Sequence, residues 1–335
     1  DFDEGEGAIA IITPWADLIY GKFRSRLGPF SSSNLSISNQ MPGFSQAHIR
    51  IKSDKVKLTF IAGELYSGLF EPIDYYGLNE EGSQDADWLL KKISRYIVNH
   101  RIDYKIKENL RIGFYEQIIV GHKLPLLYLV PTMPFWSAQH SLGDTDNLQI
   151  GFDLDYINNK NRLYFAFLMD EWAPYDTFNS DHHNWFAMQL GFSRTFRNNM
   201  LFKIEYARLE PQIYMHDFPV NMSYNYNYPT GYWSGGDSEE ILFVIFHQLK
   251  NNQDFKFTFR HTNIGNPEYS INSDFLEASD IKTRTVYELK FNKGVNTKIG
   301  LINYLFTVKS VASKNIYDID DFIDYQFSML YNINY

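Results

Sequence analysis

The residues with the most obvious chemical potential are three carboxylates that share a pattern. Asp153 and Asp155 stand two positions apart, so an extended strand places both side chains on one face, and Asp170 joins them from the neighbouring segment. A carboxylate cluster can act as a general acid and base or bind Ca²⁺. Arg101 and Arg162 share that face, however, and opposite charges on neighbouring strands form ion pairs. The pattern therefore favours ion pairs over catalysis.

Other signatures of catalysis or metal binding are missing from the sequence. The chain has no Cys, which excludes disulfides and thiolate chemistry. It contains no G-x-S-x-G, P-loop or dinucleotide-binding motif. Asp181, His182 and His183 stand together, but two adjacent His side chains in a strand point to opposite faces and make a poor metal site. We expect a non-enzymatic protein without cofactor or metal, and the net charge of −9 argues against nucleic acid as a partner.

Aromatic residues alternate with amides in two segments that we expect to be loops, 211–238 and 121–146. Aromatic rings stack on the C–H faces of sugars, while Asn, Asp and Gln bind their hydroxyls, so these segments are candidates for polysaccharide binding. A protein interface and ordinary packing are alternatives. The candidate polysaccharide-binding residues are Tyr128, Trp136, Tyr226, Tyr228, Tyr232 and Trp233.

The elements that position these residues are predicted to be strands. In the last segment, Tyr325, Phe327 and Met329 alternate with polar residues up to Tyr335, and a period of two is not compatible with a helix. Similar alternation recurs along the chain in runs of about ten residues, the length of a strand that crosses a bilayer at a tilt. No run of about 18 apolar residues is present, which excludes a transmembrane helix.

The connections between the predicted strands alternate between short and long. We expect about fifteen strands, joined by tight turns rich in Asn, Lys, Asp and Gly at one end and by long loops at the other. This is the pattern of an all-β, up-and-down antiparallel outer-membrane barrel, here a single domain over residues 1–335. A β-sandwich would be smaller, and a propeller would show a repeat of about 40–50 residues. The long loops, expected outside the cell, are 27–45, 68–91, 121–146, 171–183, 211–238, 263–282 and 309–320.

The parity of the strands bears on the complete barrel. If the last strand ends in the periplasm, the first strand visible, from Ala8, must also run inward. Because a closed antiparallel barrel with its N-terminus inside needs an even number of strands, we expect at least one more strand in or before 1–7 and 16–18 in the complete protein. The start at Asp1 is consistent with a processed or truncated N-terminus.

Charged residues of inward parity predict a network that narrows the lumen. Glu116 is an exception, because it shares the parity of Ile112 and Phe114 on the lipid side; it lies above the membrane, or a bulge turns it inward. We expect Arg95, Arg101 and Arg162 to bridge to the aspartates on adjacent strands. The residues assigned to this network are Arg95, Arg101, Asp103, Glu116, Asp153, Asp155, Arg162 and Asp170.

Three stretches between residues 20 and 171 resemble the Wzi-like capsule-assembly family of outer-membrane barrels. They differ from the family at Val130, where it has Asn, and its N-terminal helical bundle and first strands have no counterpart here. The stretches are Gly21-Lys22 … Gly28-Pro29 … Ser33–Asn39; His100–Tyr104 with Leu110–Gly121, including Gly113; and Leu129–Pro131 with Asp146-Asn147, Gly151–Asp153 and Asp170-Glu171.

The resemblance implies an eighteen-stranded barrel in a Gram-negative outer membrane, with a plugged or narrow lumen, extracellular loops and lectin-like retention of capsular polysaccharide, without catalysis. A passive porin and a structural subunit of a larger outer-membrane assembly remain alternatives, since a barrel of about sixteen strands is wide enough for a water channel. The expected partners are outer-membrane lipid and lipopolysaccharide, surface polysaccharide and, in the assembly function, other proteins.

Overall fold

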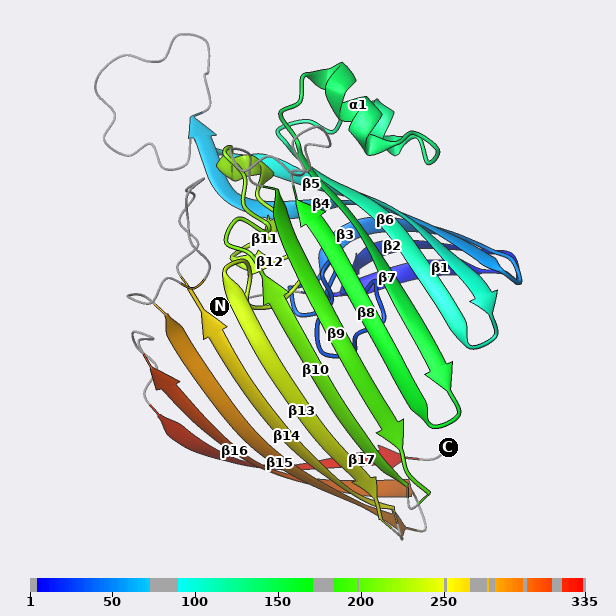
Figure 1. Cartoon of the computed structure of the whole chain (residues 1–335), viewed down its shortest axis with the longest axis vertical. Coiled ribbons are helices and arrows are strands. Elements are labelled where there is room, and N and C mark those ends of the chain that lie inside the picture. The colour runs from blue at the N-terminus through cyan, green and yellow to red at the C-terminus, as the bar shows by residue number, and fades with distance from the viewer. Residues whose placement is uncertain are drawn as a thin grey trace.

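The computed structural model describes residues 5–72, 90–170, 184–197, 199–249, 252–265, 276, 281–297, 300–314 and 321–333. In these ranges, fifteen strands form one antiparallel sheet in which each strand pairs with its neighbours in chain order (Figure 1). The strands are β1 (Gly7–Ile12), β2 (Ala16–Phe23), β3 (Phe44–Lys52), β4 (Val56–Pro72), β5 (Leu90–Lys107), β6 (Leu110–Gly121), β7 (Asn147–Asn158), β8 (Asn161–Asp170), β9 (Trp185–Thr195), β10 (Met200–Leu209), β13 (Ser238–Gln248), β14 (Gln253–Ile264), β15 (Lys282–Thr297), β16 (Gly300–Lys314) and β17 (Phe322–Ile333).

The predicted fold class is confirmed, and the short and long connections alternate as expected. The turns after β1, β3, β5, β7, β9, β13 and β15 are short, and every other connection is long. Among the described residues, no pairing joins β1 to β17, and each of these two strands has one partner in the sheet. The expected additional strand therefore stays a prediction. No helix in the described part of the chain is long and apolar enough to cross a membrane.

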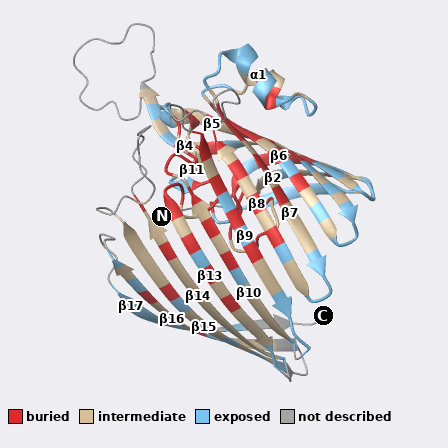
Figure 2. Cartoon of the chain, viewed as in Figure 1, coloured by how far each residue is buried: buried red, intermediate tan, exposed pale blue. Residues whose placement is uncertain are grey.

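The two faces of the sheet differ as the period of two requires. On β8, Tyr164, Ala166 and Leu168 are buried on the inner face, whereas the outward-facing Leu163 is exposed. Buried residues concentrate on β4–β10 and β13, and the inner faces of β14 to β16 are mostly half-buried (Figure 2). The difference arises because two connections fill only part of the lumen.

These two connections, residues 24–43 and 210–237, are the first and second inner segments. Both were expected to be exposed loops, and that expectation is wrong for most of their length. Leu27 and Ile37 pack with the inward-facing Ile61 and Ile97, while Phe30, Ile213 and Tyr214 pack against the inner faces of β8–β10. The second inner segment contains a short 3-10 helix, η4 (Pro219–Asn221), and a hairpin of β11 (Tyr224–Asn225) and β12 (Tyr228–Pro229). Apolar side chains within loops drive this inward folding.

A third long connection, residues 122–146, is the outer flap. It contains a 3-10 helix, η2 (Leu126–Leu129), and one α-helix, α1 (Phe135–Leu142), and is not a free loop. Pro134 precedes α1, and Gly143, with a φ of 107°, ends it in the left-handed conformation that favours glycine. The flap packs on the outer face of β5–β7 through Tyr128 and Phe135. The expected loops within 73–89, 171–183, 266–280 and 315–320, with Asp181, His182 and His183, lie outside the described residues, apart from Leu276.

A charge on the outer face should be costly if that face contacts lipid. Phe257 on β14 faces outward, and its neighbour Thr258 faces inward, directly opposite Glu288. We expect Phe257→Arg to destabilise the barrel by about 2–4 kcal/mol if the side chain lies near the bilayer midplane. Thr258→Arg, the matched control, should be tolerated because it gains an ion-pair partner. Urea unfolding in vesicles measures both, and equal stability of the two variants would contradict the assigned faces.

Candidate functional site: the lumen and the hairpin tip

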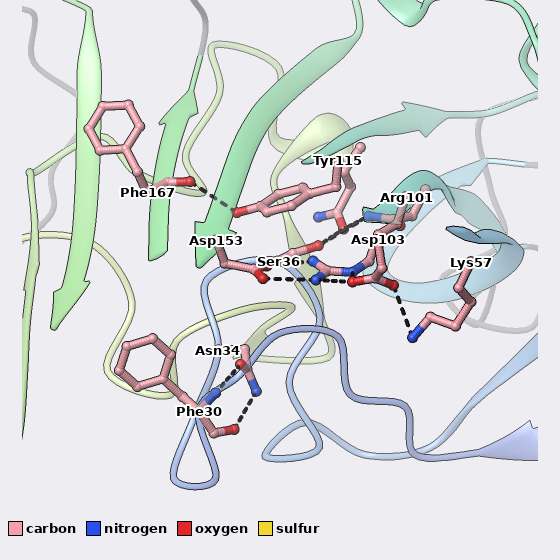
Figure 3. Close-up of polar contacts among 11 residues, drawn as sticks. Phe30, Asn34, Ser36, Lys57, Arg101, Asp103, Tyr115, Asp153 and Phe167 are labelled. Carbon is pink, nitrogen blue, oxygen red and sulfur yellow. Dashed lines mark hydrogen bonds and ion pairs between the residues drawn. The ribbon is translucent and has the colours of Figure 1, made fainter. Parts of the chain in front are cut away.

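A network of ion pairs in the lumen is centred on Arg101 of β5. Its guanidinium donates to Asp103 at 2.6 Å and to Asp153 of β7 at 2.5 Å, and Lys57 of β4 binds Asp103 at 2.9 Å. Figure 3 shows these side chains side by side across three strands. The predicted bridges from Arg101 are therefore confirmed. Because both carboxylates are satisfied by cations, they are poorly suited to acid–base catalysis.

The strand between Arg101 and Asp153 carries a glycine because the guanidinium lies directly on it. A Cβ built at Gly113 would lie 2.2 Å from Nη2 of Arg101 and 2.9 Å from Oδ1 of Asp153. A side chain at this position would displace the ion pair. Gly113 therefore supplies the space that lets a cation on β5 reach a carboxylate two strands away.

The other predicted members of the network have different partners. Arg162 binds Asp155 at 2.7 Å, as expected. Arg95 was expected to bind a carboxylate, but it donates to the backbone carbonyls of Val220, Tyr224 and Pro219 at 2.6–2.7 Å. Asp170 accepts from the amide of Gln149 at 3.0 Å and from the backbone N–H of Tyr214 at 2.7 Å. Both residues thus hold the second inner segment, whose position the strand pattern does not specify.

Glu116 does not belong to the lumen, which corrects its predicted place in the network. The β5–β6 and β6–β7 pairings run through it without a bulge, so its side chain stays on the outer face. It lies 3.3 Å from Nδ1 of His100 and accepts the backbone N–H of Phe135 at 2.9 Å. The outer flap therefore covers this carboxylate.

Hydrogen bonds join the two inner segments, which are far apart in the sequence. The hydroxyl of Tyr214 donates to the carbonyl of Leu35 at 2.7 Å, and the N–H of Ser38 donates to the carbonyl of Thr230 at 2.8 Å. Within the first segment, Asn34 closes a turn by exchanging two hydrogen bonds with the backbone of Phe30 (Figure 3). These bonds combine the two segments into one plug.

Polar residues of the wall fix this plug from the sides. Glu205 of β10 accepts from Tyr164 at 2.7 Å and from the hydroxyl of Ser32. Arg162 reaches the carbonyl of Pro29 at 2.8 Å, and Gln189 of β9 donates to the carbonyl of Ser33 at 3.0 Å. The wall therefore uses side chains to satisfy loop backbone that has no sheet partner.

The expected polysaccharide-binding residues fall into buried and accessible groups. Tyr128 is 0% exposed on the side of the outer flap that faces the wall, where its hydroxyl donates to Asp146 at 2.7 Å, and burial raises the pKa of Asp146. Tyr232 is 3% exposed and donates to Glu240 at 2.9 Å. Their predicted exposure is wrong, because both rings complete apolar clusters.

Trp233 lies at the border between the plug and the polar wall. Its indole N–H donates to Glu240 at 2.8 Å, and its ring faces the guanidinium groups of Arg260 and Arg284 at 5.3 and 5.9 Å. The ring is half-buried against the apolar cluster of the plug. Its place in the lumen differs from the outer loop surface that we expected.

Tyr226 and Tyr228 flank the exposed tip of the β11–β12 hairpin. Tyr228 is 52% exposed, and the ring of Tyr226 stacks on Tyr66 of β4 at 4.4 Å. The tip adjoins β4, since the N–H of Tyr226 donates to the carbonyl of Tyr66 at 2.9 Å. Trp136, the remaining candidate, is exposed on α1 of the outer flap, a different element.

A small polar groove of about 150 Å³ opens beside this tip, where β3 begins and β4 extends past it. Lys92 lies over the ring of Tyr66 at 4.7 Å and pairs with Glu64 at 3.8 Å. The sequence analysis did not identify Tyr66, Lys92 and Glu64. The extension of strand β4 beyond its partner β3 could have indicated a site there. The groove is lined by Lys22, Gly43, Phe44, Ser45, Glu64, Leu65, Tyr66, Lys92, Asn225 and Tyr226.

The inner face of β14 and β15 is polar and only half-buried. Lys256 and Arg260 of β14, with Glu288 and Lys290 of β15, line this part of the wall. In the described ranges, no group of three or more His, Asp or Glu side chains is arranged to hold a metal ion.

Comparison with known proteins identifies the fold. No family model matches the chain, and no curated protein sequence matches it. Among solved structures, it is similar to Wzi of Escherichia coli, described as a carbohydrate-binding β-barrel involved in group 1 capsule assembly, at 13% identity and a TM-score of 0.62 over 94% of this chain. The chain spans 66% of the length of that structure, just under two thirds.

Two Pseudomonas aeruginosa barrels show the same likeness. OccK3 (OpdO) matches at 11% identity and a TM-score of 0.55 over 97% of this chain and 79% of its own. OprD matches at 11% identity and a TM-score of 0.53 over 98% and 80%. The chain thus has the fold of outer-membrane β-barrels.

The Arg101–Asp153 ion pair should be necessary for stability because both side chains are almost fully buried. Arg101→Met leaves the buried Asp153 without its cation, whereas the more exposed Asp103 keeps Lys57, and we expect a loss of about 3–5 kcal/mol. Arg162→Met is the matched control, since the side chains of Arg162 and Asp155 are 32% and 18% exposed and water can replace the pair. We expect that variant to lose about 1 kcal/mol or less. Urea unfolding followed by gel mobility of the folded barrel compares the two, and equal losses would contradict a special role for Arg101.

Proposed function

We propose that this protein is an outer-membrane barrel of a Gram-negative bacterium that binds surface polysaccharide, with its long connections outside the cell. The observation that carries the proposal is the exposed tyrosine tip of the β11–β12 hairpin beside a polar groove. Tyr228 offers an accessible ring for the C–H face of a sugar. Glu64 and Lys92 supply carboxylate and ammonium groups for hydroxyls or acidic substituents.

The plug supports retention of a ligand over free passage. Hydrogen bonds connect the two inner segments to each other and to strands on both sides, so this part of the lumen is filled by chain. The tip projects from that plug and is therefore held by a firm base. A fixed aromatic surface loses little conformational entropy on binding, which suits a shallow site for a flexible polymer. Many copies on one cell would add avidity to weak individual sites.

The likeness to Wzi, described as carbohydrate-binding, supports the same proposal. So does the resemblance in residues 20–171 found from sequence. Neither of these two likenesses identifies the tyrosines of the site, because Tyr226 and Tyr228 lie outside residues 20–171. The hairpin tip therefore stands on its own geometry and needs its own test.

The double change Tyr226→Ala and Tyr228→Ala should reduce surface-attached polysaccharide in the native host. Each ring is expected to contribute about 1 kcal/mol, or roughly fivefold in affinity. Tyr104→Ala, which removes an exposed outer-face ring near the short-turn end of β5, is the matched control. The amount of folded barrel must be equal in all strains. Unchanged retention in the double variant would contradict the proposal.

The orientation is tested separately with a cysteine at the tip and one at the opposite end. Tyr228→Cys should react with an impermeant maleimide on intact cells. Lys160→Cys, exposed in the short turn between β7 and β8, should react only after the outer membrane is opened. The reverse pattern would invert the topology.

A passive channel is the second candidate, and the half-buried polar face of β14 and β15 favours it. Lys256, Arg260 and Lys290 line wall that the plug leaves partly accessible. An inward-folded segment is also what a porin would use as its constriction. Conductance in planar bilayers separates the two functions. We expect small or no currents from the intact chain, and several-fold larger currents when a short Gly-Ser linker replaces 212–236. Large, steady, ohmic currents from the intact chain would favour the channel.

A further inference from the structure

The outer flap lies on a face of the barrel that otherwise belongs to lipid. Val98 of β5, Ile118 and Val120 of β6 and Leu148 of β7 have outward parity, yet all four are buried. They pack beneath Tyr128, Phe135 and Ala138 of the flap. Farther along β6, the outward-facing Phe114 is exposed, as a lipid-facing residue should be. The flap therefore replaces lipid over one end of this wall.

The flap reaches well down the strands. Phe135 donates its backbone N–H to Glu116, and its ring lies 4.1 Å from that of His100. Glu116 stands near the middle of β6, whose 12 residues span about 40 Å along the strand and about 30 Å of height at the usual tilt. An apolar band about 25 Å tall includes the middle of such a strand wherever the band is placed. The flap thus extends to membrane depth.

The composition of the flap fits this position. Residues 122–143 of the flap contain His122, Lys123 and His140 and no Asp or Glu, and Asp144 and Asp146 follow at the end that joins β7. Its accessible surface is rich in aliphatic residues, among them Leu126 at 80% exposure and Val130 at 41%. The polar residues Ser137 and Ser141 of α1 are exposed, whereas Phe135 and Ala138 are buried. A surface with one aliphatic side, and with acidic groups only at the end that joins β7, suits an anionic membrane interface.

We propose that the outer flap is an interfacial membrane anchor, which inserts Leu126 and Val130 among the acyl chains of the outer leaflet. It also separates the His100–Glu116 pair from lipid, where an uncovered polar pair on the wall would be costly. The occupant of the flap's exposed apolar surface is lipid, because that surface continues the lipid-facing wall of β5–β7. The inference rests on the outer-membrane location proposed above and is independent of polysaccharide binding.

The absence of Cys from the chain makes a clean labelling experiment possible. Single-cysteine variants Leu126→Cys and Val130→Cys of the full chain are spin-labelled in vesicles of phosphatidylcholine and phosphatidylglycerol. Ser141→Cys is the control on the same flap, and Leu163→Cys on β8 is the control on the lipid-facing wall. We expect labels at 126, 130 and 163 to collide more with oxygen than with a water-soluble nickel chelate, and the label at 141 to show the reverse.

Three results would overturn the anchor. If the labels at 126 and 130 are as accessible to nickel as the label at 141, while 163 stays in lipid, the flap lies in water. If the label at 163 is also accessible to nickel, the outer-membrane location itself fails. If 126 and 130 are shielded from both reagents in native membranes but exposed to nickel in the vesicles, a protein covers the flap. None of these measurements involves polysaccharide, so the two proposals fail separately.

Discussion

The structure depends on one constraint, which is that alternate side chains of every strand must face opposite surroundings. Because the outer face is apolar, the polar residues of the wall are directed inward, where each needs a partner. Arg101 finds carboxylates on its own and another strand, but Arg95 and Gln189 find only backbone carbonyls of the inner segments. The segments in turn have no sheet partners for their own backbone. The wall and the plug therefore satisfy each other's hydrogen-bonding groups, and we expect neither to be stable in this form alone.

The strand pattern alone predicted the fold class, the strands of the sheet, the alternation of connections and the pairing of Arg101. The alternation of apolar and polar residues is a local property, so it can be recognised in one segment at a time. The folding of the loops was not predictable in the same way, because their aromatic residues suit exposed binding and buried packing equally well. Tyr128 and Tyr232 were assigned to the surface on composition, and tertiary contacts bury them. Tyr226 and Tyr228 remain candidates because the hairpin turn holds them at the tip.

Glu116 shows how the same constraint produces an exception. The sequence indicated that its side chain points outward, and it predicted either a position above the membrane or a bulge. The structure has no bulge at this position, since the pairing of β6 is regular, and a loop supplies partners for the carboxylate. His100 occupies the facing position on β5, so the sheet register provides one partner and the outer flap another. At Glu116, a polar residue on the outer wall thus coincides with a connection that folds back along the outside.

The bonds between the two inner segments also constrain how the molecule assembles. Tyr214 and Leu35 are separated by 179 positions, and Trp233 and Ser33 by 200. The formation of such contacts has a large entropic cost, because a long loop must be closed. We therefore expect them to form only after the intervening strands have curled. Completion of the plug is consequently a late folding event, which reports that the wall from β3 to β13 has reached its proper curvature. A misregistered strand in this region would leave the two segments unable to meet, so the interior of the finished barrel serves as a built-in check on its own assembly.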